Sequence, residues 1–372
     1  MLPAITDIKT RFPDAQIDWV VEESFAQIPA WHPAIHEVIP VAHRRWRKQW
    51  WSAQSKKERH AFKERLTQTQ YDVVLDMQAL LKTVWITRLA KGVKHGLDWK
   101  SAREPLCSLF YDVKHRVEFW QPAITRQRLL ASLAFDYPCT GAPNYGLQGI
   151  THAVAVEPIA MIMPSASRDD KLWPETSWHQ VFDFLQKNGL GLRLLAGNEH
   201  EAERARQLLI GRENAVVLPR MGLTEVAHEL AKARIMVGLD SGLTHLSAAL
   251  ERPTIGIYKA STPVRTPLIS SAYTATLTVA DLRSRGFKLR TAEGLVDFSE
   301  SLDAQDQIVL RRGPTAGFVP GAQMYTEDPV SVPGYMRQVE RWNGGGVENA
   351  VKRLRGAGEG AGTPNGQGRK GL

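Results

Sequence analysis

Strand-like and helix-like segments alternate between residues 159 and 258. The run IAMIMP (159–164) is short and continuously apolar, as in a parallel strand that is buried on both faces. In the next segment, 175–189, large apolar side chains recur at the spacing of one helix face: Trp178, Val181, Phe182 and Leu185. The alternation continues with strand-like segments 191–197, 214–219, 234–240 and 253–258, separated by helix-like segments 199–211, 223–233 and 242–251. Parallel strands joined by helices require right-handed crossovers, so the pattern predicts a doubly wound α/β sheet with its ligand site at the carboxyl ends of the strands.

The first half repeats this alternation with weaker apolar runs. Its strand-like segments are 17–22, 37–41 and 71–77, and helix-like segments lie before, between and after them. The stretch PCTGAPNYGLQG (138–149) supplies the Pro and Gly residues of a linker. We therefore expect two Rossmann-like domains, residues 1–150 and 151–280, that face a cleft.

Both ends of the chain depart from this pattern. Residues 2–16 are helix-like and lead directly into the strand 17–22, so we expect the first domain to lack the strand with which a doubly wound domain normally opens. Beyond about residue 275 no clear period remains, and ten of the 29 residues from Gly344 to Leu372 are glycine. Burial in such a segment cannot offset the entropy cost of ordering it. We expect residues 281–372 to be a divergent, largely disordered tail, which suggests a frameshifted or foreign ending.

The composition is that of an ordinary globular protein. Of the 372 residues 43% are hydrophobic and 23% are charged, which suits about two domains of ~150 residues each. Cys107 and Cys139 are too few for a disulfide framework, and no signal-peptide pattern opens the sequence, so we expect a reducing cytosol. No apolar run approaches the ~18 to 20 residues that cross a bilayer. The chain is expected to lie on a membrane rather than to span one.

The net charge of +8 is concentrated in one segment. Residues 44–65 contain nine Lys or Arg residues and only two acids, Glu58 and Glu64. A patch of this kind attracts anionic partners over a long range that salt shortens. For residues 56–65 the simpler interpretation is a solvated helix face with i,i+4 neighbours.

The stretch VAHRRWRKQWW (41–51) adds three indoles to these cations, Trp46, Trp50 and Trp51, with no acid between them. Large exposed aromatic side chains usually mark a surface for a partner. Nucleic acid, an anionic membrane surface and a negatively charged substrate are the alternatives. Because no recognised nucleic-acid-binding module accompanies the patch, we expect no nucleic-acid partner.

Polar side chains lie at the end of the predicted strand 234–240 and just after it, where a ligand site is expected. Asp240, Ser241 and Gly242 lead into the first turn of a helix that carries His245. The unpaired N–H groups and the dipole of that turn favour an anion. A plain N-cap would also place Asp or Ser here, and the spacing alone does not separate the two interpretations. An acid repels a diphosphate, so Asp240 is better suited to position a hydroxyl group or a sugar.

Two more clusters follow neighbouring strands. MPSASRDDKLWP (163–174) contains Ser167 and Lys171, and a lysine here would neutralise a phosphate leaving group unless it is only a solvated loop cation. Glu201 follows the strand 191–197, where an acid often binds ribose hydroxyls. Its alternative role is that of a first-turn helix acid.

Several common sites have no sequence motif in this chain. There is no G-x-G-x-x-G after a strand, no P-loop, no G-x-S-x-G, no C-x-x-C and no H-E-x-x-H. A dedicated metal site and a dinucleotide cofactor are therefore not expected. A nucleotide-linked substrate between two domains is the interpretation that remains.

Four segments of the sequence are similar to a known family. They are IDWVVEESFAQIPAWHPAIHEVIPVAHRRWRK (17–48), VKHGLDWKSAREPLCSLFY (93–111), SRDDKLWP (167–174) and LDSGLTHLSAALERPTIGIY (239–258). They resemble the lipopolysaccharide heptosyltransferase I family of inverting GT-B glycosyltransferases. The resemblance implies transfer of L-glycero-D-manno-heptose from ADP-heptose to the Kdo sugar of Kdo2-lipid A. It also implies a monomer without a cofactor, cytoplasmic and peripheral on the inner membrane surface. The tryptophans would then rest at the lipid interface, and the alternative is that one or two of them pack under the loop.

The resemblance also implies roles for individual residues. Acceptor binding falls to the cations of the RRWRK segment and of two later segments: Arg44, Arg45, Arg47, Lys48, Arg103 and Arg126. Donor binding falls to Ser167, Lys171, Glu201, Asp240, Ser241, Gly242 and His245. Lys171 and the turn at 241–242 would stabilise ADP as it leaves.

The family's general base has no equivalent in this sequence. In the family it is an Asp of a Gly-Asp pair just before the helix that matches LPAITD (2–7), and this chain starts after that position. Neither Asp7 nor Asp14 matches it, so no general base is named. The alternative to an active transferase is an inactive, truncated remnant that still binds a sugar nucleotide.

Overall fold

The structure is a computed structural model of the chain. It describes residues 1–152, 154–166, 168–259, 261, 263–270, 274–278, 288–291, 294–297 and 310–311. Met1–Gly317 form one compact unit and Phe318–Leu372 a second. All described residues belong to the first unit, so most of the predicted tail lies outside them.

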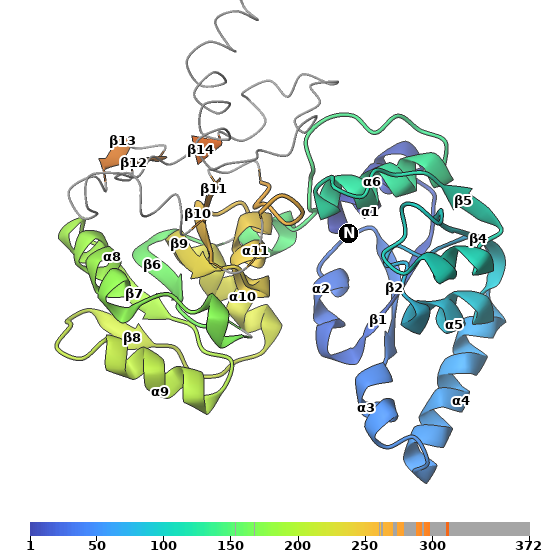
Figure 1. Cartoon of the computed structure of the whole chain (residues 1–372), viewed down its shortest axis with the longest axis horizontal. Coiled ribbons are helices and arrows are strands. Elements are labelled where there is room, and N and C mark those ends of the chain that lie inside the picture. Colours follow the sequence, from blue (N-terminus) through green and yellow to red (C-terminus); the bar gives the residue numbers. More distant parts are fainter. Residues whose placement is uncertain are drawn as a thin grey trace, which may run out of the picture. The chain divides into compact units, whose positions relative to one another are not determined.

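The first half of the described chain contains the following elements (Figure 1). They are α1 (Leu2–Arg11), β1 (Ile17–Glu22), η1 (Glu23–Phe25), α2 (Gln27–Ala30), β2 (Ile35–Val41), α3 (His43–Lys48), α4 (Ala53–Gln68), β3 (Gln70–Leu75), α5 (Leu81–Leu89), β4 (Lys91–Leu97), η2 (Pro105–Phe110), β5 (Val113–His115), α6 (Ala123–Ala134) and α7 (Gln148–Thr151).

The second half continues with more regular alternation. Its elements are β6 (Glu157–Met163), η3 (Asp169–Lys171), α8 (Glu175–Lys187), β7 (Gly191–Leu194), α9 (Glu199–Leu208), β8 (Ala215–Val217), α10 (Leu223–Lys232), β9 (Ala233–Leu239), α11 (Gly242–Ala249), β10 (Thr254–Tyr258), β11 (Thr274–Thr278), β12 (Lys288–Thr291), β13 (Gly294–Asp297) and β14 (Leu310–Arg311).

Seven strands of the second half form one sheet with the order β14-β11-β10-β9-β6-β7-β8 (Figure 1). β12 and β13 pair with each other in a separate antiparallel sheet. In the seven-stranded sheet, every pair except β11–β14 is parallel. Alternate side chains of β6 point to opposite faces. Ile162 packs in the cluster that contains Phe182 of α8, whereas Met161 packs with Leu230 of α10. The predicted doubly wound α/β sheet is therefore confirmed.

The first half is parallel as well, but its strands form two separate sheets. β1 pairs with β2, and β3, β4 and β5 form a second sheet. The side chains of β1 and β3 still meet, because Val20 packs in one cluster with Val74 and the Tyr71 hydroxyl donates to Asp18 Oδ2 over 2.8 Å. Among the described strands, none joins the two sheets.

The strands predicted in the first half are all present, with bounds shifted by a few residues. The helix expected after the strand 71–77 is present as α5, which ends at Leu89, two residues before β4 begins at Lys91. β4 and β5 were not predicted, because KGVKHGL and VKH interrupt their apolar positions with Lys and His. None of the described helices has the length and apolar character that a membrane crossing needs.

Candidate functional site

Two neighbouring parallel strands bring Lys171 and Asp240 together. β6 and β9 are adjacent in the sheet; Lys171 ends the short helix η3 after β6, and Asp240 directly follows β9. Lys171 Nζ lies 2.9 Å from Asp240 Oδ2. The Ser261 hydroxyl donates to the same oxygen over 2.7 Å, and His245 Nε2 lies 3.3 Å from Oδ1. Three residues predicted from two separate segments thus form one cluster.

Hydrogen bonds dominate the electrostatics of this cluster. Burial by itself would raise the pKa of Asp240, but the hydrogen bonds from His245, Lys171 and Ser261 outweigh it and hold that pKa well below its ordinary value. The Asp240 side chain is 14% exposed and that of Lys171 is 17% exposed. Asp240 is therefore ionised at neutral pH, and Lys171 is a paired cation rather than a solvated one.

The turn after Asp240 combines a helix cap with open space. Ser241 is the N-cap of α11, and its Oγ accepts from the Thr244 N–H over 3.4 Å, so the cap interpretation is correct. A Cβ added to Gly242 would meet nothing within 4 Å. Gly238 is different, since a Cβ there would lie 2.5 Å from Thr244 Oγ1. The absence of a side chain at Gly238 lets α11 approach β9 closely and so sets the position of the turn.

Glu201 stands apart from the cluster. Its carboxylate accepts from the Gly197 N–H over 2.8 Å and from Asn198 Nδ2 over 2.9 Å, while Asn198 Oδ1 caps the Glu201 N–H. This is the first-turn helix acid that the sequence offered as an alternative. In the described part of the chain no contact joins Glu201 to Asp240, and its role in donor binding stays a prediction. Ser167 lies outside the described residues.

Ser261 and Tyr258 were not among the predicted site residues. Both lie at the carboxyl end of a parallel strand, where site residues are expected. Tyr258 ends β10 and Ser261 lies in the loop after it, and β10 is next to β9 in the sheet. Tyr258 places its hydroxyl 3.5 Å from His245 Nε2 and donates to the Thr266 carbonyl over 2.6 Å. The position of this loop after the strand 253–258 is the signal in the sequence, since its residues form no recognisable motif.

The basic segment divides into paired and exposed cations. Arg45 donates to Glu23 over 3.0 and 2.9 Å and to Glu58 over 2.8 Å. These carboxylates raise its pKa further above its ordinary value. By contrast, Arg44, Arg47 and Lys48 are exposed. Arg45 is thus already bound within the protein, whereas its neighbours face solvent.

The three tryptophans of this segment also differ. Trp46 is buried, and its Nε1 donates to Glu58 over 2.7 Å. Trp50 is 48% exposed and Trp51 is 80% exposed. The Arg59 guanidinium lies over the Trp50 ring, 3.8 Å from its centroid. Only the two indoles after α3 are therefore open to a partner.

The two later cations of the predicted acceptor set lie near one another. Arg103 is exposed, and Arg126 of α6 donates to the carbonyl of Ser101, two residues before Arg103, over 2.5 Å. The Arg126 guanidinium also lies 5.2 Å from the centroid of the Phe119 ring. Their contact with an acceptor stays a prediction.

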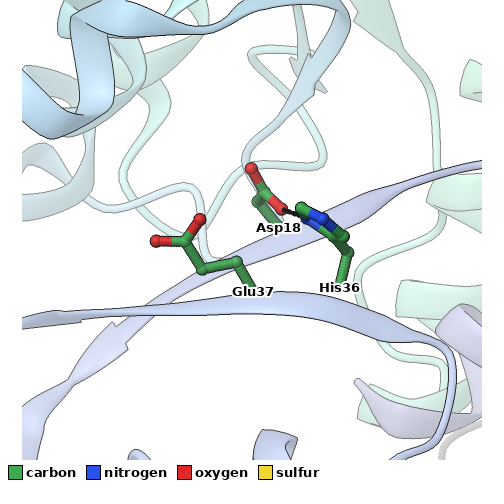
Figure 2. A group of neighbouring side chains, drawn as sticks. All are labelled: Asp18, His36 and Glu37. Atoms are coloured by element: carbon green, nitrogen blue, oxygen red, sulfur yellow. Dashed lines mark hydrogen bonds and ion pairs between the residues drawn. The ribbon is translucent and has the colours of Figure 1, made fainter.

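A cluster of potential metal ligands lies on the first sheet (Figure 2). Asp18 of β1 and His36 and Glu37 of β2 bring their side-chain ligand atoms within 4.8 Å of one another. Arg65 donates to both oxygens of Glu37 and its Nη2 lies 3.9 Å from Asp18 Oδ2. The cluster already contains a cation, so we interpret it as an ion-pair network that ties α4 to the sheet.

Comparison with known proteins gives the family. The family model of glycosyltransferase family 9 (heptosyltransferase) matches residues 59–293 of this chain. The chain belongs to this family. Among its relatives, lipopolysaccharide heptosyltransferase 1 of Salmonella typhimurium and of Escherichia coli K12 are each 46% identical to it over 267 residues, which covers 70% of this chain and 84% of the relative. The enzyme of that name from Pseudomonas aeruginosa is 44% identical over 266 residues, covering 70% of this chain and 75% of that one.

Solved structures agree with the family assignment. The structure of E. coli heptosyltransferase WaaC with ADP has a TM-score of 0.72 and 43% identity, and the match covers 74% of this chain and 88% of that chain. The same enzyme with ADP-2-deoxy-2-fluoro heptose gives a TM-score of 0.68 at 43% identity, covering 74% and 87%. The resemblance to lipopolysaccharide heptosyltransferase I and the predicted GT-B fold class are thereby confirmed.

Proposed function

We propose that this family 9 glycosyltransferase transfers L-glycero-D-manno-heptose from ADP-heptose to the Kdo sugar of Kdo2-lipid A. The observation that carries the proposal is the cluster of Lys171, Asp240 and His245 at the carboxyl ends of β6 and β9. It occupies the edge at which doubly wound sheets bind nucleotides. The E. coli relative with the same fold was solved with ADP. We assign donor binding to residues 151–280 and acceptor binding to residues 1–150.

On the donor side, the cluster suits a diphosphate that gains charge as it leaves. Lys171 Nζ is fixed by Asp240 at 2.9 Å, so little reorganisation is needed when negative charge develops beside it. The start of α11 at Ser241 and Gly242 adds the positive end of a helix dipole. In this proposal Asp240 and His245 orient Lys171 and the heptose hydroxyls. Ser167 and Glu201 complete the donor set, with Glu201 at the ribose.

On the acceptor side, exposed cations suit an acidic glycolipid. The side chains of Arg44, Arg47, Lys48 and Arg103 are exposed, and guanidinium groups match carboxylates and phosphates with two parallel hydrogen bonds. Arg45 and Arg126 belong to the same proposed set, but the two carboxylates that Arg45 binds are supplied by the protein. We therefore expect Arg45 to hold the segment in place while its neighbours contact the acceptor.

We also propose that the segment rests on the cytoplasmic face of the inner membrane. Trp50 and Trp51 are exposed beside Arg47 and Lys48. Indoles favour the headgroup region of a bilayer, and cations near an anionic surface contribute about 1 kcal/mol each. Sedimentation with anionic vesicles should fall for Trp51→Ala and not for Trp120→Ala, which removes an indole that is also exposed. Equal sedimentation of both variants and the parent would contradict this placement.

The general base remains unassigned. The Asp7 carboxylate accepts from Arg128 Nε over 2.6 Å and from Nη2 over 3.1 Å, so it is occupied by an internal ion pair. Asp14 is exposed at the turn after α1. The occupied Asp7 keeps open the second candidate function, a protein that binds the sugar nucleotide without turning it over.

The test is ADP release measured with each substrate alone and with both. The proposal expects release only when ADP-heptose and a Kdo-containing acceptor are both present. Lys171→Met should lower kcat/KM on the order of 100-fold, as expected when a preorganised charge is lost. Lys187→Met, which removes an exposed lysine at the end of α8, is the matched control. ADP binding without release in the parent protein would select the second candidate, and absence of both would refute the donor site.

A further inference from the structure

Two arginines share one aromatic ring outside the Asp240 cluster. The guanidinium of Arg265 lies 4.1 Å from the centroid of Phe119, and that of Arg126 lies 5.2 Å from the same centroid. Arg126 is in the first turn of α6, and Arg265 belongs to the segment 263–270 after β10. The Ala123 N–H donates to the Arg265 carbonyl over 2.8 Å. Backbone and ring contacts therefore both join this segment to the start of α6.

The charge of this pair is not balanced within the described chain. Neither Arg126 nor Arg265 has a described carboxylate within ion-pair distance, and Arg126 Nε is buried without a hydrogen-bond partner. Burial and then the nearby Arg265 lower the pKa of Arg126. Arg128, on the same helix, shows the opposite case, because Asp7 and two backbone carbonyls accept its hydrogen bonds. A buried guanidinium nitrogen without an acceptor is costly.

The surrounding backbone adds positive potential. α6 spans twelve residues, has no acid in its first turn, and has no side-chain cap at Pro122. The Arg265 carbonyl accepts the Ala123 N–H, so the N–H groups that follow it in the first turn, together with the dipole, present the partial positive charge. An anion here would neutralise two like charges and supply the missing acceptor.

We propose that Arg126 and Arg265 form a two-arginine site for a carboxylate or phosphate group, and that in the proposed transferase this group belongs to the acceptor. Arg265 is the residue that this proposal adds to the acceptor-binding set. The loop after β10 therefore also takes part in acceptor binding. The acceptor is favoured over the donor diphosphate because Arg126 donates to the Ser101 carbonyl beside the exposed Arg103. The assignment to the acceptor rests on the proposed function, whereas the anion site itself does not.

The first experiment uses inorganic phosphate alone and requires no enzymatic activity. At constant ionic strength, phosphate should raise the Tm of the parent protein, since a ligand that binds only the native state stabilises it. Arg265→Gln and Arg126→Gln should lose most of this shift, and Arg265→Lys should keep part of it. The matched control is Arg88→Gln, which removes a single arginine that lies over Phe110 at 5.5 Å. An equal phosphate shift in Arg265→Gln and the parent overturns the site.

The second experiment identifies the source of the anion. In steady-state transfer assays, Arg265→Gln should raise the KM for the acceptor about tenfold, the loss expected for one charge-assisted hydrogen bond. The KM for ADP-heptose and kcat should stay within about twofold. The double variant should lose less than the product of the single losses, because both arginines bind one group. A rise confined to the donor KM would overturn the acceptor assignment. Failure of all transfer would refute the proposed function while the phosphate result still decides the site.

Discussion

β6 and β1 are both parallel strands, yet they are buried to different degrees. The last five residues of β6 are buried, whereas all six residues of β1 are only half-buried. β6 pairs with β7 on one side and β9 on the other, and helices cover both of its faces. β1 pairs with β2 alone among the described strands. Strand pairing on both edges, together with a longer apolar run, thus accounts for the deeper burial of β6.

The residues of the two proposed binding regions differ in the same way. Asp240 has three side-chain partners within the protein, Lys171, His245 and Ser261. In the first half Arg47 and Lys48 are exposed on the short helix α3. The donor region is therefore fixed before a ligand arrives, while the acceptor region relies on charges that attract a ligand from solvent and are weakened by salt.

The largest expected effect is on stability: replacing isoleucine by alanine should lower the free energy of unfolding more in β6 than in β1. Ile162 is 0% exposed in β6, and Ile17 in β1 is half-buried. Ile162→Ala should lower the free energy of unfolding by about 3 to 5 kcal/mol, the upper range for a fully buried isoleucine. Ile17→Ala should cost about 1 to 2 kcal/mol, because less area is withdrawn from water. Urea unfolding measures both values.

The same unfolding data test whether β6 is better packed than β1. Both variants lose the same atoms, so a difference in cost reflects only the surroundings. Equal costs, or a larger cost at Ile17, would show that β1 is as well packed as β6. In that case the separation of the first half into two sheets would not weaken its core.

The next largest effect is on the KM values of the two substrates, each of which should respond to a different substitution. Asp240→Asn leaves Lys171 without its carboxylate partner, so the KM for ADP-heptose should rise about tenfold or more, as for a lost hydrogen bond to a charged group. Arg47→Gln removes one solvent-exposed cation, so the KM for the acceptor should rise about threefold. Each variant should leave the other KM unchanged in steady-state assays. A crossed pattern, with Asp240→Asn affecting the acceptor, would reverse our assignment of the two halves.

The regular half of the fold was the more predictable from the sequence. Buried strands of a parallel sheet are continuously apolar, as in 159–164, and α8 shows helical spacing through Trp178 and Phe182. β4 lacks such a run, because Lys91 and Lys94 interrupt its apolar positions and only Gly96 and Leu97 of this strand are buried. The pattern of apolar residues therefore predicts buried strands more readily than partly exposed ones.

The candidate site shows a similar limit. Asp240 and Lys171 were predicted at one sheet edge, because the carboxyl ends of parallel strands converge there. The internal pairing of Arg45 could not be predicted, since its acids Glu23 and Glu58 are 22 and 13 residues away in sequence. Ser261 is 21 residues from Asp240. Only tertiary structure shows which of several cations is already paired.

A smaller effect should distinguish Arg45 from Arg47, two cations of α3. Arg45→Gln removes the partner of two carboxylates and should lower Tm by about 2 °C. Arg47→Gln should leave Tm unchanged and act only on the acceptor KM, because no described carboxylate contacts it. Thermal unfolding and steady-state assays on the two purified variants separate these roles. If Arg47→Gln also lowered Tm, the interpretation of Arg47 as a free cation would be wrong.

The smallest effect is a difference in the response to pH and salt. Hydrogen bonds hold the pKa of Asp240 below its ordinary value of 3.8 against the opposing effect of burial. The bond from Arg45 lowers the pKa of Glu23 below 4.5. Because both folded-state pKa values are depressed, each acid stabilises the native state above its ordinary pKa and loses that contribution as the pH falls below it. The stability difference between the parent and Asp240→Asn, or Glu23→Gln, should therefore shrink below about pH 4.

Salt then separates the buried acid from the exposed one. The Glu23 side chain is 40% exposed, so about 0.5 M NaCl should remove most of its pH-dependent contribution. The contribution of Asp240, at 14% exposure, should persist because less solvent surrounds the pair. Urea unfolding of the parent and both variants between about pH 3 and pH 7 at low and high salt measures this. Equal sensitivity of the two acids to salt would show that the donor cluster is as open to solvent as the basic segment.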